Sequence, residues 1–195
     1  MKISIIGNGN VGSALAERLS RLDHEVTVAD SKTDPATVAE AVAAADAVIL
    51  AVTFPAVAEL DARVKAATVG KIVIDATNPL AADFMSLTLG YTTSAGEQNA
   101  ATLTGARLVK AFNTVFAGNL ANAQLGGTSQ FLPIAGDGTE AKQLVLKLGE
   151  ELGFDAVDVG ALACARYTEP AVELLIQTAF GAGLGPGIGY LLARG

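Results

Sequence analysis

The chain of 195 residues is long enough for one α/β domain with a well-formed core and too short for two full domains. About half of the residues (51%) are apolar and 17% are charged, a balance typical of a compact fold rather than a disordered chain. The formal net charge is −7 and the 13 basic residues are scattered along the chain, so we expect no nucleic-acid partner.

Short apolar runs rich in valine and isoleucine alternate with alanine-rich segments of helical periodicity, which predicts βαβ units. The predicted strands are residues 3–6, 25–29, 47–51, 71–75, 107–111, 131–135 and 156–159. The predicted helices are residues 11–22, 35–44, 55–67, 96–103 and 139–152, and a last helical stretch begins near residue 165. Nearly continuous apolar strands imply a sheet covered on both faces. We therefore predict an α/β fold with a doubly wound, mainly parallel, Rossmann-like sheet. Residues 1–195 form a single domain in this prediction, with residues 165–195 as a short helical extension.

The first predicted strand runs into a glycine-rich turn that opens a helix. The turn reads Gly7, Asn8, Gly9, Asn10, Val11 and Gly12, the G-x-G-x-x-G pattern between a strand and a helix. Its first glycine allows the tight turn, the second lets a pyrophosphate approach, and the third allows close packing of helix on strand. The helix N-terminus adds unpaired N–H donors. We interpret residues 7–12 as a dinucleotide-binding loop, with a purely structural turn as the alternative.

The second predicted strand is followed by Asp30, where an acidic side chain bonds the ribose hydroxyls of NAD(H) and repels a 2′-phosphate. Ser31 and Lys32 come next, and a hydroxyl beside an ammonium suits the 2′-phosphate of NADP(H). These residues leave NAD(H) and NADP(H) open. A third interpretation is that Asp30 and Ser31 only open a turn.

The next three predicted strands end in small and polar residues at the sheet edge where such folds bind ligands. These residues are Ala51, Val52 and Thr53 after the third strand, Ala76 and Asn78 after the fourth, and Asn113 after the fifth. We expect the first group to line the dinucleotide and the others to lie near its nicotinamide half. An ordinary Asn-Pro turn is the alternative for Asn78, and a helix cap is the alternative for Asn113.

Side chains for acid–base chemistry are scarce in this chain. The single histidine, His24, precedes the second strand at the opposite edge of the sheet, and the single cysteine, Cys164, has no histidine partner. These counts exclude an intramolecular disulfide and a Cys/His metal site, so we expect no metal. Alcohol dehydrogenation needs a proton acceptor, whereas hydride exchange between two ring cofactors needs mainly their alignment. The composition therefore favours ring-to-ring transfer and identifies no catalytic side chain.

No targeting or membrane segment is evident. Residue 1 leads directly into a strand without a cleavable signal, and we expect a cytoplasmic protein. The longest apolar stretch, residues 171–192, is interrupted by Glu173, five glycines and Pro186. We interpret it as a helix buried in the domain or at a subunit contact, and we expect no membrane partner.

Four segments together resemble the NADP oxidoreductase family that includes the coenzyme F420-dependent NADP reductases. They are residues 7–12, 110–115, 135–137 and 160–169. The resemblance extends over nearly the whole chain and favours NADP(H) over NAD(H). It implies hydride transfer between the nicotinamide and a deazaflavin, a flavin or a similar small acceptor, in a homodimer. NADP-selective members tend to present arginine after the second strand, where this chain has Asp30, Ser31 and Lys32.

The resulting prediction is an NAD(P)H-dependent oxidoreductase. A β-hydroxyacid dehydrogenase-like reductase is the second choice among enzymes, because the long helical domain of that class does not fit the remaining length. A non-catalytic dinucleotide-binding redox sensor is the alternative outside enzymes.

Overall fold

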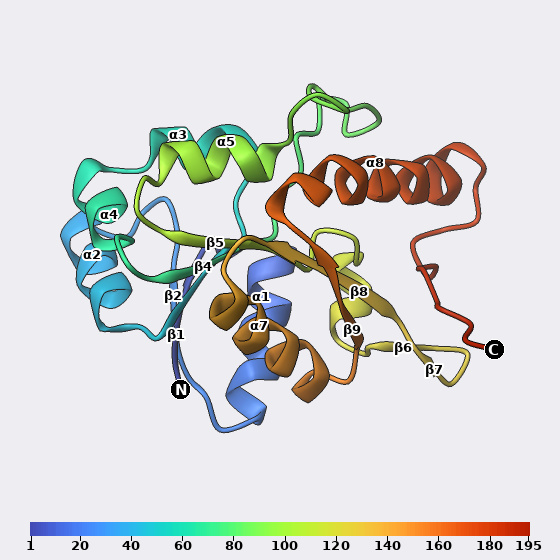
Figure 1. Cartoon of the computed structure of the whole chain (residues 1–195), viewed down its shortest axis with the longest axis horizontal. Helices are drawn as coiled ribbons and strands as arrows, with labels where there is room; N and C mark the ends of the chain where they lie inside the picture. Colours follow the sequence, from blue (N-terminus) through green and yellow to red (C-terminus); the bar gives the residue numbers. More distant parts are fainter.

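The computed structural model describes residues 1–195, and seven strands form its central sheet (Figure 1). They are β1 Lys2–Ile6, β2 Glu25–Ala29, β3 Ala47–Leu50, β4 Ile72–Asp75, β5 Arg107–Lys110, β8 Phe131–Gly136 and β9 Asp155–Gly160. Their order is β2-β1-β3-β4-β5-β8-β9. The first five strands are parallel, β8 pairs antiparallel with β5, and β9 pairs parallel with β8. The predicted mainly parallel, Rossmann-like sheet is confirmed.

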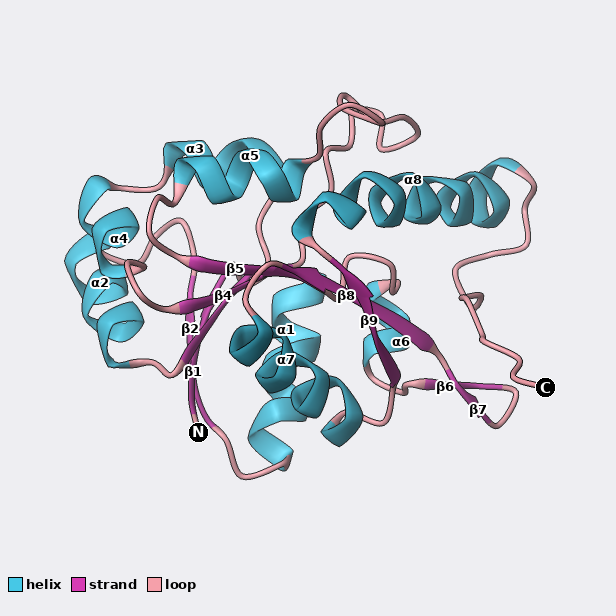
Figure 2. Cartoon of the chain, in the orientation of Figure 1, coloured by secondary structure: helices cyan, strands magenta, loops and turns pink.

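Helices cover both faces of the sheet (Figure 2). They are α1 Asn10–Arg21, α2 Pro35–Ala44, α3 Phe54–Glu59, α4 Ala62–Ala67, α5 Ala95–Thr102, α6 Ala117–Leu120, α7 Thr139–Glu151 and α8 Ala165–Ile176. Because neighbouring strand residues point to opposite faces, Ile5 enters a core with α1 and α7, whereas Ile6 enters a second core with α2. All residues of β3 and β4 are buried, as their apolar pattern predicts.

The reversal at β8 was not visible in the sequence pattern. Between β5 and β8 the chain forms α6 and a small ribbon, β6 Gln124–Leu125 and β7 Thr128–Ser129. Val109 pairs with Gly136 and Lys110 with Ala135 in an antiparallel register, so β8 runs against β5. The chain therefore enters β8 from the carboxyl edge of the parallel strands, and β8 and β9 run in the opposite direction.

Two predicted helices differ from the structure. The segment 55–67 is broken at Leu60 and Asp61, because Asp61 accepts a hydrogen bond from the backbone N–H of Arg63 and starts α4 as a new helix. At the C-terminus the predicted helix is present as α8 and the π-helical turn Gln177–Gly181. Residues 182–195 have no regular secondary structure and return along the edge of β8.

No helix of this chain combines the length and the apolar character that crossing a membrane requires.

Candidate functional site

The loop after β1 is shaped by two glycines that leave no room for a side chain. Gly7 has a φ of +116°, and a Cβ atom there would collide with the carbonyl oxygen of Ala51. A Cβ atom at Gly12 would collide with the carbonyl oxygen of Gly7. Because neither position carries a side chain, β1, β3 and α1 can pack closely together, as the sequence pattern predicts for the first and third glycines.

Gly9 is different, because a Cβ atom there would meet nothing within 4 Å. Gly9 is also the N-cap of α1 and has no side chain to bond the first turn, whose first helical hydrogen bond joins Ser13 N to Gly9 O at 2.9 Å. The preceding N–H groups, of Asn10, Val11 and Gly12, are free for an anion at the positive end of the helix. Open space beside unpaired donors fits a pyrophosphate group.

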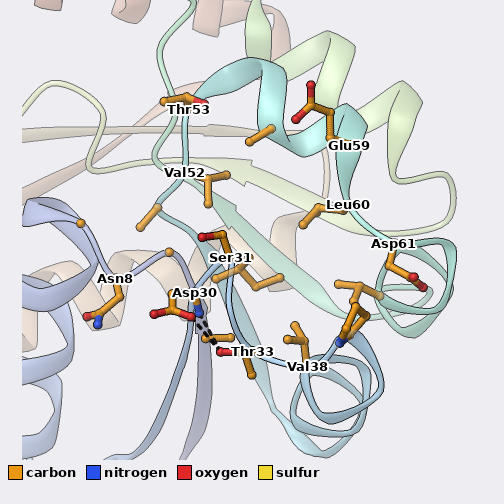
Figure 3. Close-up of a pocket in the computed structure, with 18 residues that line it drawn as sticks. Asn8, Asp30, Ser31, Thr33, Val38, Val52, Thr53, Glu59, Leu60 and Asp61 are labelled. Atoms are coloured by element: carbon orange, nitrogen blue, oxygen red, sulfur yellow. Dashed lines mark hydrogen bonds between the residues drawn. The ribbon is translucent and has the colours of Figure 1, made fainter.

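A cavity of about 680 Å³ lies next to this loop, at the carboxyl ends of β1, β2 and β3 (Figure 3). Its volume is in the range of cofactor sites. The predicted residues that line it are Gly7, Asn8, Gly9, Asp30, Ser31, Ala51, Val52 and Thr53. Lys32 lies in the exposed loop between two lining residues. The structure therefore gathers the loop, the end of β2 and the end of β3 around one space.

Asp30 organises the turn that follows β2. Its Oδ1 atom accepts hydrogen bonds from the backbone N–H of Lys32 at 2.9 Å and from the Thr33 hydroxyl at 3.2 Å. The Thr33 hydroxyl in turn accepts from the Asp30 N–H at 3.0 Å. These donors, the Lys32 N–H foremost, hold the pKa of the Asp30 carboxyl below its usual value. Asp30 thus opens a turn and also faces the cavity as a carboxylate.

The sequence interpretation missed three polar residues of the cavity wall: Thr33, Glu59 and Asp61. Thr33 is recognisable only through its bond to Asp30, which is a three-residue Asx-type pattern. Glu59 and Asp61 reach the wall because the chain breaks between α3 and α4. Arg63 forms a two-pronged ion pair with Asp61, at 2.9 and 3.1 Å, and its hydrogen bonds lower the pKa of Asp61 to about 2.

Asn78 and Asn113 meet at the ends of β4 and β5, further along the same edge. The Asn78 amide donates to the Asn113 carbonyl oxygen at 2.9 Å, and the Asn113 amide donates to Asn78 Oδ1 at 3.1 Å. Asn113 is buried and its own Oδ1 has no partner, whereas Asn78 and Ala76 are half-buried. Asn113 therefore supports Asn78 and caps no helix, because the N-cap of α6 is Phe116.

His24 lies away from these residues, as expected. Its ring pairs with Glu151 at 3.2 Å and approaches the N-terminal amine, at the edge where β1 and β2 begin. No group of three or more histidine, cysteine, aspartate or glutamate side chains is arranged to hold a metal ion.

Comparisons with known proteins agree with this architecture. The family described as "NADP oxidoreductase coenzyme F420-dependent" matches residues 2–79. The F420-dependent NADP reductase of Methanothermobacter marburgensis is 32% identical, over 91% of this chain and 92% of that protein. A solved structure from Arthrobacter sp. FB24, named as a candidate F420-dependent NADP reductase, aligns over both complete chains with a TM-score of 0.88 and 28% identity. A structure from Sinorhizobium meliloti, of a hypothetical protein, has a TM-score of 0.70 and 32% identity over 85% of this chain and 88% of that one.

The similarity to the Methanothermobacter reductase extends over almost all of both chains, and the full-length structural match includes the reversed strands and the C-terminal helix. The chain belongs to the F420-dependent NADP reductase family and is an NADP-dependent oxidoreductase.

Proposed function

We propose that the chain transfers hydride between NADP(H) and a deazaflavin of the coenzyme F420 type. One observation carries this proposal. The strand-end loops 51–54, 76–79 and 111–116 contain no titratable side chain. A site without an acid or base in these loops suits hydride transfer between two aligned rings. The names of the relatives point to the same acceptor.

The residues present fit the cofactor. The uncapped start of α1 and the space at Gly9 suit the pyrophosphate, and Ser31 with Lys32 suits the 2′-phosphate. Asn78, further along the same edge of the sheet, is our candidate contact for the nicotinamide end. When bound, NADPH would supply the hydride, and the proton that completes reduction of the deazaflavin would come from solvent. The chain's task is to orient the two rings and keep solvent from between them.

We also propose that the active form is a homodimer joined through α8. Tyr167 and Leu174 lie seven residues apart on this helix, so they share one face, and both side chains are more than half exposed. Phe180 and Leu184 extend the apolar surface beyond the helix. An exposed apolar stripe of this kind is typical of a subunit contact.

Mixing the protein with NADPH and oxidised F420 should bleach the visible absorbance of F420 while NADPH is consumed in equal amount. Flavins serve as alternative acceptors in parallel reactions. Tight NADPH binding without oxidation by any acceptor would refute the proposal and favour a redox sensor.

Lys32→Ala should weaken NADPH binding about tenfold, because a charged hydrogen bond to the 2′-phosphate is lost, and should leave NADH binding unchanged. Asp30→Asn should strengthen NADPH binding, since the amide keeps the turn and removes a like charge. Dissociation constants for both cofactors measure these effects. Equal loss of NADH and NADPH affinity in Lys32→Ala would contradict the assignment of Lys32 to the phosphate.

Gly9→Val should abolish binding of NADPH and leave the chain folded with a cooperative thermal transition, because the new side chain fills space that only a ligand needs. Gly12→Ala is the contrasting variant. It should lower the free energy of unfolding by about 1–3 kcal/mol, because the added methyl group collides with the backbone of Gly7. Normal NADPH affinity in Gly9→Val would contradict the assignment of the pyrophosphate to this loop.

Leu174→Glu should convert the dimer into a monomer, since it places a charge on the proposed contact. Sedimentation velocity measures the mass of both proteins. A monomeric wild-type chain at micromolar concentration would disprove this part of the proposal.

A further inference from the structure

A fully buried cluster of charges lies beneath the ends of β4 and β5. The ammonium of Lys110 is 3.2 Å from Asp75 Oδ2 and 2.9 Å from Glu169 Oε1, and none of the three side chains is more than 1% exposed. Glu169 also accepts hydrogen bonds from Ala95 N and Gly96 N, at 2.9 and 3.0 Å, in the first turn of α5. Burying charges costs solvation energy, and substitution by apolar residues is often neutral for stability. The cluster therefore calls for an explanation beyond packing.

Thr77 is the residue on which this cluster acts. Its carbonyl oxygen accepts a hydrogen bond from the Lys110 ammonium at 2.6 Å, and its N–H donates to Asp75 Oδ1 at 2.8 Å. Its hydroxyl oxygen accepts from the Asn99 amide at 3.1 Å. Every polar group of Thr77 is thus bonded to a buried side chain. These three hydrogen bonds restrict the backbone of Thr77 more than an ordinary turn would.

Asn78 follows Thr77 directly and is held a second time by Asn113. The two hydrogen bonds between these residues use one N–H and one lone pair of the Asn78 amide. One N–H and one lone pair remain for a ligand. Phe112, beside Asn113, is buried and has a φ of +65°, a left-handed conformation that is strained for a phenylalanine. Such strain persists where the surrounding structure enforces a local geometry, and it often accompanies a binding site.

We propose that the Asp75–Lys110–Glu169 cluster holds Asn78 in place to bond the carboxamide of the nicotinamide, with Lys110 as the positioning residue. This inference rests on the proposed binding of NADP(H). A carboxamide offers two N–H donors and one acceptor oxygen, which complement the free donor and acceptor of Asn78. Lys110 does not touch the cofactor and acts through Thr77.

The cluster also connects the C-terminal helix α8 to the proposed site, because one of its three residues lies on that helix. Glu169 comes from α8, and the neighbouring Arg166 forms a two-pronged ion pair with Glu97 of α5, at 2.6 and 2.9 Å. Both contacts fasten α8 to α5, but only Glu169 reaches the group that holds Thr77. Arg166 therefore provides a matched control, since its loss weakens the same helix pair and leaves Lys110 untouched.

The test compares two binding probes, NADPH and 2′-phospho-ADP-ribose, which lacks the nicotinamide. The variant Lys110→Met/Glu169→Gln removes one positive and one negative charge, so the formal charge of the cluster is unchanged. We expect it to bind NADPH about tenfold more weakly and 2′-phospho-ADP-ribose as well as wild type does, because only the nicotinamide contact is lost. Arg166→Met should bind both probes as wild type does. Thermal melts report the stability of each variant.

Equal weakening for both probes, or no weakening for either, would overturn the positioning role of Lys110. If the double variant does not fold, Asn113→Leu provides the test. It removes the hydrogen bond that the Asn113 amide donates to Asn78, and the other atom it removes, Asn113 Oδ1, has no hydrogen-bond partner. Selective loss of NADPH affinity in that variant supports the proposal, and unchanged affinity contradicts it. If the wild-type chain binds 2′-phospho-ADP-ribose as tightly as NADPH, the nicotinamide adds no affinity. That result refutes only this inference. Failure of wild type to bind either probe refutes the proposed function itself.

Discussion

The ammonium of Lys110 is completely buried, and the fold can keep it there only because two carboxylates and a carbonyl oxygen surround it. One carboxylate comes from β4 and the other from α8, so neutralising this charge ties the parallel sheet to the C-terminal helix. The same contacts reach α5 through its first N–H groups. An apolar residue in place of Lys110 could not form the ion pairs that join β5 to β4 and to α8, whose Glu169 also bonds α5. This single charge thus links the carboxyl ends of β4 and β5 to α8 and to the backbone of Thr77.

Local patterns predicted most of the fold and many of the residues that line the cavity near the N-terminus. Apolar runs marked the strands, and the glycine spacing marked the turn at residues 7–12, because both depend on neighbours a few positions apart. The direction of β8 depends on the path of the connection 111–130, and the break between α3 and α4 depends on one capping aspartate. Both features have weak local signatures in the sequence. The charge cluster joins residues 75, 110 and 169, which lie far apart in the sequence. No local pattern around any one of them predicts its contact with the other two.

The cavity presents an electrostatic conflict that the structure resolves only in part. Asp30, Glu59 and Asp61 face a space in which NADP(H) would place a doubly charged phosphate, and Lys32 is the cation closest in sequence to the Asp30 turn. Hydrogen bonds from Lys32 N and the Thr33 hydroxyl engage one oxygen of Asp30, and Arg63 engages Asp61. The hydroxyls of Ser31 and Thr33 supply neutral donors after β2, and the free N–H groups of α1 supply others at the positive end of that helix.

The two ends of the proposed cofactor site are built from different parts of the chain. The cavity near β1, β2 and β3 is lined only by residues up to Val64, so all of its walls come from the first third of the chain. Lys110, by contrast, lacks one of its counter-charges until Glu169 has left the ribosome. During synthesis the ammonium of Lys110 therefore cannot reach its native surroundings until most of the chain has left the ribosome. The order of synthesis makes α8 the last element to join this charge cluster.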